Sequence, residues 1–187
     1  MKIILASASP RRKMILEQAG VTFEICVSDL DEVITQTEPA AVVEELSAQK
    51  AGDVAKKYPP DVLVIGADTV VACMGQILGK PKDEADAKEM LSMLSGKTHQ
   101  VYTGVTLILN GRVHTFHAVT DVSVCELSEA EIDSYVNSGE PLDKAGAYAI
   151  QGLFGKYITA INGEYNNVVG LPIAAIHAHC QELGIDL

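Results

Sequence analysis

Residues 99–127 read HQVYTGVTLILNGRVHTFHAVTDVSVCEL, and this stretch decides the fold class. Two long runs rich in apolar and β-branched residues flank Asn110-Gly111, a dipeptide typical of the tight turn in an antiparallel hairpin. A second Asn-Gly turn, at 162–163, lies between the segments KYITAI and YNNVVGLP, which we interpret as further strands and loops. The chain is therefore expected to contain antiparallel strand pairing.

Strand and helix patterns alternate on both sides of this hairpin. Ser9 and Pro10 suit the start of a helix that Gly20 can end, and Ser128 with Glu131 forms the pattern of a capping box. Mixed elements with a clear hairpin predict an α/β or α+β protein with a mixed sheet. The remaining predicted elements are strands at 3–6, 22–27 and 62–74 and helices at 39–58, 84–94 and 173–183.

Length and composition favour one globular domain over residues 1–187, either as a single core or as two small lobes that share a sheet. The 14 basic and 25 acidic residues give a net charge of −11, which opposes general binding to nucleic acid or to an anionic membrane. No apolar run approaches the roughly 20 residues of a membrane helix, so we expect a cytoplasmic protein. The four widely spaced cysteines predict reduced thiols rather than a zinc site or disulfides.

The start of the first helix carries two arginines, Arg11 and Arg12, where the helix dipole disfavours positive charge. Together with the hydroxyls of Ser7 and Ser9 and the unpaired N–H groups of the first turn, these guanidinium groups would suit phosphate oxygens. The alternative is that both arginines point into solvent or pair with surface acids.

Asp68 lies within the apolar run VLVIGADTVVACM, where a carboxylate needs either a cleft or a strong partner. It could bind a divalent cation or orient a water nucleophile, or it could cap a turn between two strands. Glu32, in the acidic stretch DLDE, taken singly has the pattern of a solvated acid.

Several cations occupy special local settings. Lys50 falls on the apolar stripe of its predicted helix, and Lys80 lies between Gly79 and Pro81 in a constrained loop. Lys144 and Gln151 lie among small residues that allow a ligand to approach the backbone. Taken together, these cations and the two acids are what a polyphosphate substrate with a metal ion requires.

The chain carries six motifs in this order: SASPRR, GADTVV, LGKPKD, LSGKTHQVYTGV, DKAGAYAIQG and NGEYNNVVGLP. Through these motifs it resembles the Maf family from about residue 5 to residue 172. Its members are described as septum-formation inhibitors and as nucleoside triphosphate pyrophosphatases. The resemblance implies an elongated, two-lobed, mixed α/β fold around a central mixed sheet with a cleft, similar to inosine triphosphate pyrophosphatases. It also implies a homodimer and a Mg²⁺ or Mn²⁺ cofactor.

By position, the resemblance assigns Asp68 as proton acceptor and Glu32 as the acid near the metal, with Asp68 as a second possible metal ligand. Arg11, Arg12, Lys50 and Lys80 match the phosphate-binding cations, and Arg11, Thr69 and Gln151 are the positions associated with base choice. Gln151 resembles the branch that acts on dTTP and UTP, and its amide can donate to and accept from thymine or uracil.

These assignments predict hydrolysis of dTTP and UTP to the monophosphate and pyrophosphate, with modified pyrimidine nucleotides as further candidates. One alternative is a pyrophosphatase for 7-methyl-GTP or another modified nucleotide. A second is a nucleotide-binding regulator of septum formation that acts through a partner.

Overall fold

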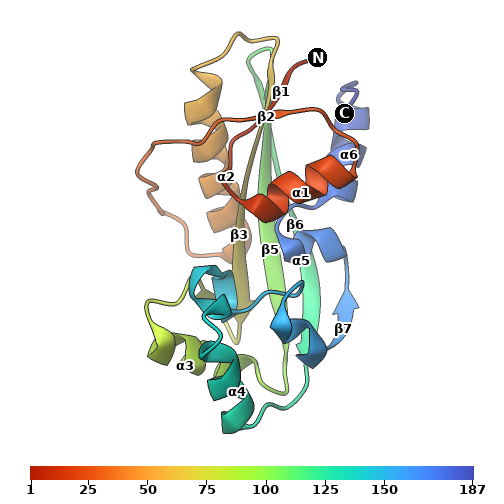
Figure 1. Ribbon diagram of the computed structural model, residues 1–187. Coiled ribbons are helices and arrows are strands. Elements are labelled where there is room, and N and C mark those ends of the chain that lie inside the picture. The colour runs from red at the N-terminus through yellow and green to blue at the C-terminus, as the bar shows by residue number, and fades with distance from the viewer. The chain divides into compact units, whose positions relative to one another are not determined.

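A computed structural model describes all residues from 1 to 187 and contains one mixed β-sheet with six α-helices (Figure 1). The strand order is β2-β1-β3-β5-β6-β7, and β4 pairs with β3. β1 is parallel to β2 and β3, whereas the β3–β4 and β6–β7 pairs are antiparallel, which confirms the mixed sheet. The strands are β1 (Ile3–Leu5), β2 (Glu24–Ile25), β3 (Leu63–Cys73), β4 (Gln76–Leu78), β5 (Thr98–Leu109), β6 (Arg112–Val124) and β7 (Ile158–Asn162).

Three helices begin at the caps that the sequence predicts. The side chains of Ser9 and Asp83 accept backbone N–H groups at the starts of their helices, and Ser128 with Glu131 completes the capping box. No helix combines the length and the apolar character that crossing a bilayer requires. The helices are α1 (Pro10–Gln18), α2 (Pro39–Ala55), α3 (Glu84–Leu94), α4 (Glu129–Val136), α5 (Tyr165–Val169) and α6 (Ile173–Glu182), with 3₁₀ turns at Glu140–Asp143, Ala145–Ala147 and Leu153–Tyr157.

The chain forms two compact units, each assembled from segments that are distant in sequence. The first unit comprises residues 1–69, 103–118 and 170–187, and the second comprises residues 70–102 and 119–169. A cluster around Ile4, Ala51 and Val64 forms part of the core of the first unit. Leu91 and Phe154 belong to the apolar core of the second. The assignment of residues 1–187 to one domain stays a prediction.

Two glycines let α2 approach the sheet of the first unit closely. A Cβ atom on Gly66 would lie 2.6 Å from the carbonyl oxygen of Ser47, and one on Gly104 would lie 2.2 Å from that of Val43. Both distances are shorter than real Cβ contacts, so a side chain at either position would push the helix away. Ser47 Oγ and Thr106 Oγ1 are hydrogen-bonded at 2.9 Å in the same contact.

This close packing determines which side chains of α2 reach β3. Alternate residues of a strand share a face, so Asp68 points to the same side of β3 as Gly66. Lys50 lies three residues beyond Ser47, on the part of α2 that follows the contact with Gly66. The glycine contact therefore brings a lysine of the helix over a carboxylate of the strand.

The structure differs from the sequence prediction at several elements, among them β4, which was not expected. β3 is continuous through Asp68, so the interpretation of this residue as a turn cap is wrong. Residues 165–169, expected to be strand or loop, form α5, whose buried Asn167 side chain donates to Val101 O in β5 and Thr120 Oγ1 in β6 and so attaches the helix to these strands. The strand predicted at 22–27 is ordered as β2 only at residues 24–25, both of which are exposed.

Candidate active site

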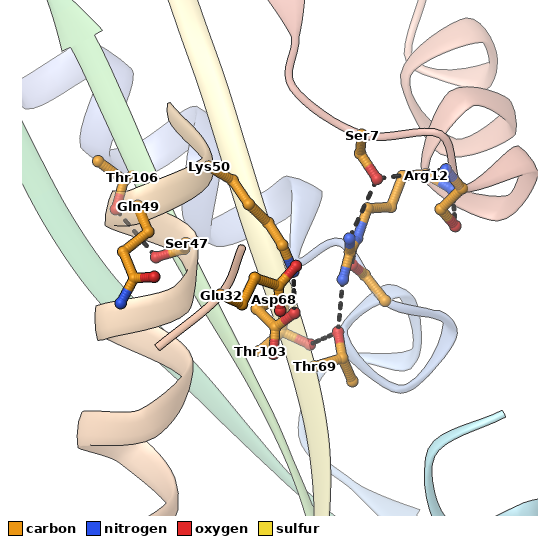
Figure 2. A network of polar contacts seen from close by, with 12 residues as sticks. Ser7, Arg12, Glu32, Ser47, Gln49, Lys50, Asp68, Thr69, Thr103 and Thr106 are labelled. Carbon is orange, nitrogen blue, oxygen red and sulfur yellow. Dashed lines mark hydrogen bonds and ion pairs between the residues drawn. The ribbon is translucent and has the colours of Figure 1, made fainter. Parts of the chain in front are cut away.

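Arg12 turns its side chain inward and connects three segments of the first unit. Its Nη1 donates to Ser7 Oγ at 3.1 Å, its Nη2 to Thr69 Oγ1 at 3.1 Å and its Nε to Gly170 O at 2.8 Å (Figure 2). Ser7 follows β1, Thr69 lies in β3 and Gly170 precedes α6. The alternative that this arginine points into solvent or pairs with a surface acid is wrong, because its partners are hydroxyl and carbonyl oxygens.

The partners of Arg12 leave its positive charge uncompensated by direct contact. Burial lowers the pKa of Arg12, and the negative charge of Asp68 opposes this shift. A guanidinium has a very high pKa and stays charged in proteins. It also carries five N–H groups, of which the three contacts above use three. Its other two N–H groups make no hydrogen bond within the protein.

The serines before α1 shape its first turn. Ser9 Oγ accepts the Arg12 backbone N–H at 3.4 Å, and Ser7 Oγ accepts the Ser9 backbone N–H at 3.2 Å. Both predicted phosphate-binding hydroxyls are therefore already engaged within the protein. Arg11, by contrast, is partly buried, and its side chain makes no hydrogen bond or ion pair. Its guanidinium can contact a ligand without breaking an internal bond.

Lys50 lies between two carboxylates, which is the most distinctive feature of the site. Its Nζ contacts Asp68 Oδ1 in a short ion pair and Glu32 Oε1 at 3.1 Å (Figure 2). The side chains of Lys50 and Asp68 are only 17% and 15% exposed, whereas that of Glu32 is 46% exposed. A mostly buried ammonium and carboxylate need each other, because removing either leaves an unpaired charge. The predicted acids Glu32 and Asp68 thus meet through the predicted cation Lys50.

Thr69 joins these two groups of residues. It follows Asp68 in β3, accepts from Arg12 and is hydrogen-bonded to Thr103 Oγ1 at 2.9 Å. Thr103 was not singled out from the sequence, although it belongs to the motif LSGKTHQVYTGV. Its hydroxyl connects β5 to the same part of β3.

The oxygens of Glu32 and Asp68 suit a hard divalent cation. Magnesium commonly binds through one or two protein carboxylates, several waters and the phosphates of a substrate. No group of three or more His, Cys, Asp or Glu side chains forms a metal cage in this structure. The donor set therefore fits a metal ion shared with a polyphosphate rather than one held by the protein alone.

Lys80, Lys144 and Gln151 lie in the second unit. Lys80 is exposed in the loop after β4, and the carbonyl of Gly79 in that loop accepts the Gly146 N–H at 3.0 Å. Lys144 is only 14% exposed and pairs with Asp143, so its charge is already compensated. Gln151 is exposed between two 3₁₀ turns. Their roles in substrate binding stay predictions from the sequence.

A buried histidine and tyrosine fix the loop that carries Gln151. His99 Nε2 and Tyr148 Oη are 2.7 Å apart, and both side chains are buried. Burial lowers the pKa of His99 to about 4, so the ring is neutral at pH 7. Both residues belong to motifs noted above, but neither has a local pattern that would identify it.

Comparison with known proteins places this geometry in context. A family model described as "Maf-like protein" matches residues 2–183. A protein of Agathobacter rectalis named "dTTP/UTP pyrophosphatase" is 56% identical over 203 aligned residues, which cover 100% of this chain and 99% of the relative. A protein of Lachnoclostridium phytofermentans with the same name is 52% identical over 191 residues, which cover 100% of this chain and 97% of the relative.

Solved structures support the fold independently. A HAM1 protein from Coxiella burnetii superimposes with a TM-score of 0.56 at 14% identity and covers 98% of both chains. The Ham1 protein of Staphylococcus aureus gives a TM-score of 0.51 at 14% identity, covering 97% of this chain and 99% of that one. At this identity the likeness concerns the fold alone.

Proposed function

Because the chain belongs to the Maf family, we propose that it hydrolyses dTTP and UTP to the corresponding monophosphate and pyrophosphate. Relatives that it matches over its full length carry the name "dTTP/UTP pyrophosphatase". The observation that carries the proposal is Lys50 held between Glu32 and Asp68, since a cation and two acids beside an arginine suit a polyphosphate reaction.

The triphosphate is bound by the cations of the first unit. Arg11 and the two remaining N–H groups of Arg12 donate to phosphate oxygens, and the N-terminus of α1 adds its partial positive charge. Lys50 exchanges part of its contact with Asp68 for a phosphate oxygen. This exchange frees the Asp68 carboxylate.

Asp68 then acts as the general base. A water molecule attacks the α-phosphorus, Asp68 accepts its proton, and the bond from the α-phosphorus to the bridging oxygen breaks to release pyrophosphate. Glu32 and Asp68 are the residues that would hold Mg²⁺ or Mn²⁺, which supplies charge neutralisation on the phosphates when bound. Gln151 selects the base by donating to and accepting from the edge of thymine or uracil. We expect the enzyme to act as a cytoplasmic homodimer.

A nucleotide panel tests this proposal. The protein is incubated with dTTP, UTP, CTP, dATP, GTP and 7-methyl-GTP in the presence of Mg²⁺, Mn²⁺ or EDTA, and the products are identified by chromatography. Release of pyrophosphate from dTTP and UTP, abolished by EDTA, is expected. Preferential turnover of 7-methyl-GTP, or release of orthophosphate, would contradict the assignment.

A further inference from the structure

Glu32 reaches Lys50 from a segment that is not held by apolar packing. We call residues 28–35, between β2 and α2, the strap; it contains neither helix nor strand. Its apolar side chains face outward, since Leu30, Val33 and Ile34 are 47%, 59% and 59% exposed. Figure 1 shows this orange segment running alongside α2 before the chain turns into the helix. Something other than burial must fix its position.

Three polar side chains of α2 hold the strap in place. Glu45, Gln49 and Asp53 are spaced four residues apart and so lie on one face of the helix. Each binds a different part of the strap. Glu45 accepts hydrogen bonds from Thr35 N at 2.9 Å and from Thr35 Oγ1 at 2.5 Å. Gln49 binds Val33. Asp53 accepts from Ser28 Oγ at 2.9 Å and from Asp29 N at 3.2 Å.

The central contact, made by Gln49, is two-sided. Its Oε1 accepts the Val33 N–H at 3.0 Å, and its Nε2 donates to the Val33 carbonyl at 2.6 Å. One amide therefore satisfies both backbone groups of one residue, as a neighbouring strand would. An amide is suited to this because it offers a donor and an acceptor together.

The contact at Val33 is also the one nearest to the acid. Val33 follows Glu32 directly in the chain, and Gln49 directly precedes Lys50 in α2. In the chain, the pair Glu32–Lys50, 3.1 Å apart, is thus flanked by the hydrogen-bonded pair Val33–Gln49. Figure 2 shows Glu32 beside Lys50. Since the Glu32 side chain is half exposed, this clamp on the next residue helps to determine where its carboxylate lies.

We infer that Gln49 is a positioning residue, which holds Glu32 at the distance from Lys50 and Asp68 that catalysis requires. The expected loss in kcat rests on the proposed function. The expected loosening of the strap rests on the hydrogen bonds alone. Outer-shell groups that orient metal ligands typically change activity about 10- to 100-fold when removed, and Gln49, which acts through the Val33 backbone, is expected at the lower end. Loss of the clamp leaves Asp68 and its ion pair with Lys50 in place.

The experiment compares Gln49→Ala and Gln49→Met with the matched control Gln181→Ala. Met keeps the length and helix propensity of Gln but makes neither hydrogen bond. Gln181 is an exposed glutamine in α6. Hydrogen exchange is measured on the nucleotide-free proteins, and kcat and KM for dTTP are measured with Mg²⁺. Both Gln49 variants are expected to exchange several-fold faster in residues 28–35 and to lose about 10-fold in kcat; the control is expected to match the wild type.

A second comparison separates positioning from a general structural effect. Gln49→Met is added to Glu32→Gln, and the kcat of the double variant is measured. If Gln49 acts through Glu32, the second change costs nothing further; an equal fold-loss in both backgrounds would overturn the inference, as would unchanged exchange in the strap. A wild type that releases no pyrophosphate would instead refute the proposed function, while the exchange data would still decide whether the clamp exists.

Discussion

Replacing Arg12 with alanine removes a side chain that serves both the fold and the ligand, whereas Arg11→Ala removes one that serves the ligand alone. Arg12 donates to Ser7, Thr69 and Gly170, and thereby connects the loop after β1, the strand β3 and the start of α6. The sequence alone predicts that neither substitution harms the helix. The structure predicts that only Arg11→Ala leaves stability intact.

The size of the effect follows from the three bonds. A hydrogen bond from a charged donor contributes about 1.5 kcal/mol at the low end of the usual range, which suits a partly buried side chain, and water replaces part of what is lost. We therefore expect Arg12→Ala to lower the free energy of unfolding by about 2–4 kcal/mol, and Arg11→Ala by less than about 0.5 kcal/mol. For a chain of this length the first change lowers Tm by roughly 5–15 °C.

The assay pairs thermal unfolding with dTTP turnover on the same preparations. Both variants should lose turnover by one or more orders of magnitude, but only Arg12→Ala should unfold earlier. Arg12→Lys serves as a control for charge, since a lysine keeps the positive charge but cannot donate to Ser7, Thr69 and Gly170 at once in the geometry of a guanidinium. A Tm for Arg12→Ala equal to that of the wild type would refute the structural role, and normal turnover in Arg11→Ala would remove that residue from phosphate binding.

Asp68→Asn should reduce turnover about 10²–10⁴-fold while dTTP still binds, measured by kinetics and calorimetry on one folded variant; near-normal turnover would exclude the base role. The same change should lower stability modestly, because Lys50 then keeps only Glu32 as an anionic partner. Gln151→Glu should lose dTTP and UTP selectively in a substrate panel, and an equal loss for all nucleotides would contradict base selection. His99 has a pKa of about 4 in the folded protein and 6.5 as a free side chain, so between these values the unfolded chain binds a proton that the folded chain does not. The free energy of unfolding should therefore fall as the pH is lowered from 6.5 to 4. Urea unfolding at a series of pH values should show a smaller fall for His99→Gln than for the wild type.

The features that sequence predicts well are local ones. Ser9, Asp83 and Ser128 cap helices because each accepts a backbone N–H three residues ahead, a relation contained within four letters of sequence. The hairpin turn at Asn110-Gly111 is equally local, and both residues have the positive φ that the dipeptide favours.

The features that sequence misses depend on contacts between distant residues. Asp68 has the same local pattern whether it caps a turn or pairs with a lysine, and the choice depends on Lys50, 18 residues away on another element. The acceptor of Arg12 Nε is Gly170, 158 residues away. Sequence reasoning identified the ionic residues of the site, because charges in apolar or dipole-opposed settings need a reason.

Gln49 shows the limit of such reasoning most clearly. A glutamine on the surface of a helix is a common residue in a common place, so no local rule is broken. Its importance arises only because the strap lies along α2 with outward-facing apolar side chains and a backbone that has side chains of α2, not a neighbouring strand, as partners. Neutral residues that position charged ones leave no comparable signal.

The central claim is that water attacks the α-phosphorus, and identifying the product that receives the water oxygen tests it most directly. Hydrolysis of dTTP in H₂¹⁸O, followed by mass spectrometry of the products, distinguishes attack at the α-phosphorus from attack elsewhere on the triphosphate. Water activated by Asp68 beside the α-phosphate should place one ¹⁸O atom in the thymidine monophosphate and none in the pyrophosphate. Label in the pyrophosphate, or labelled orthophosphate with thymidine diphosphate, would contradict the account.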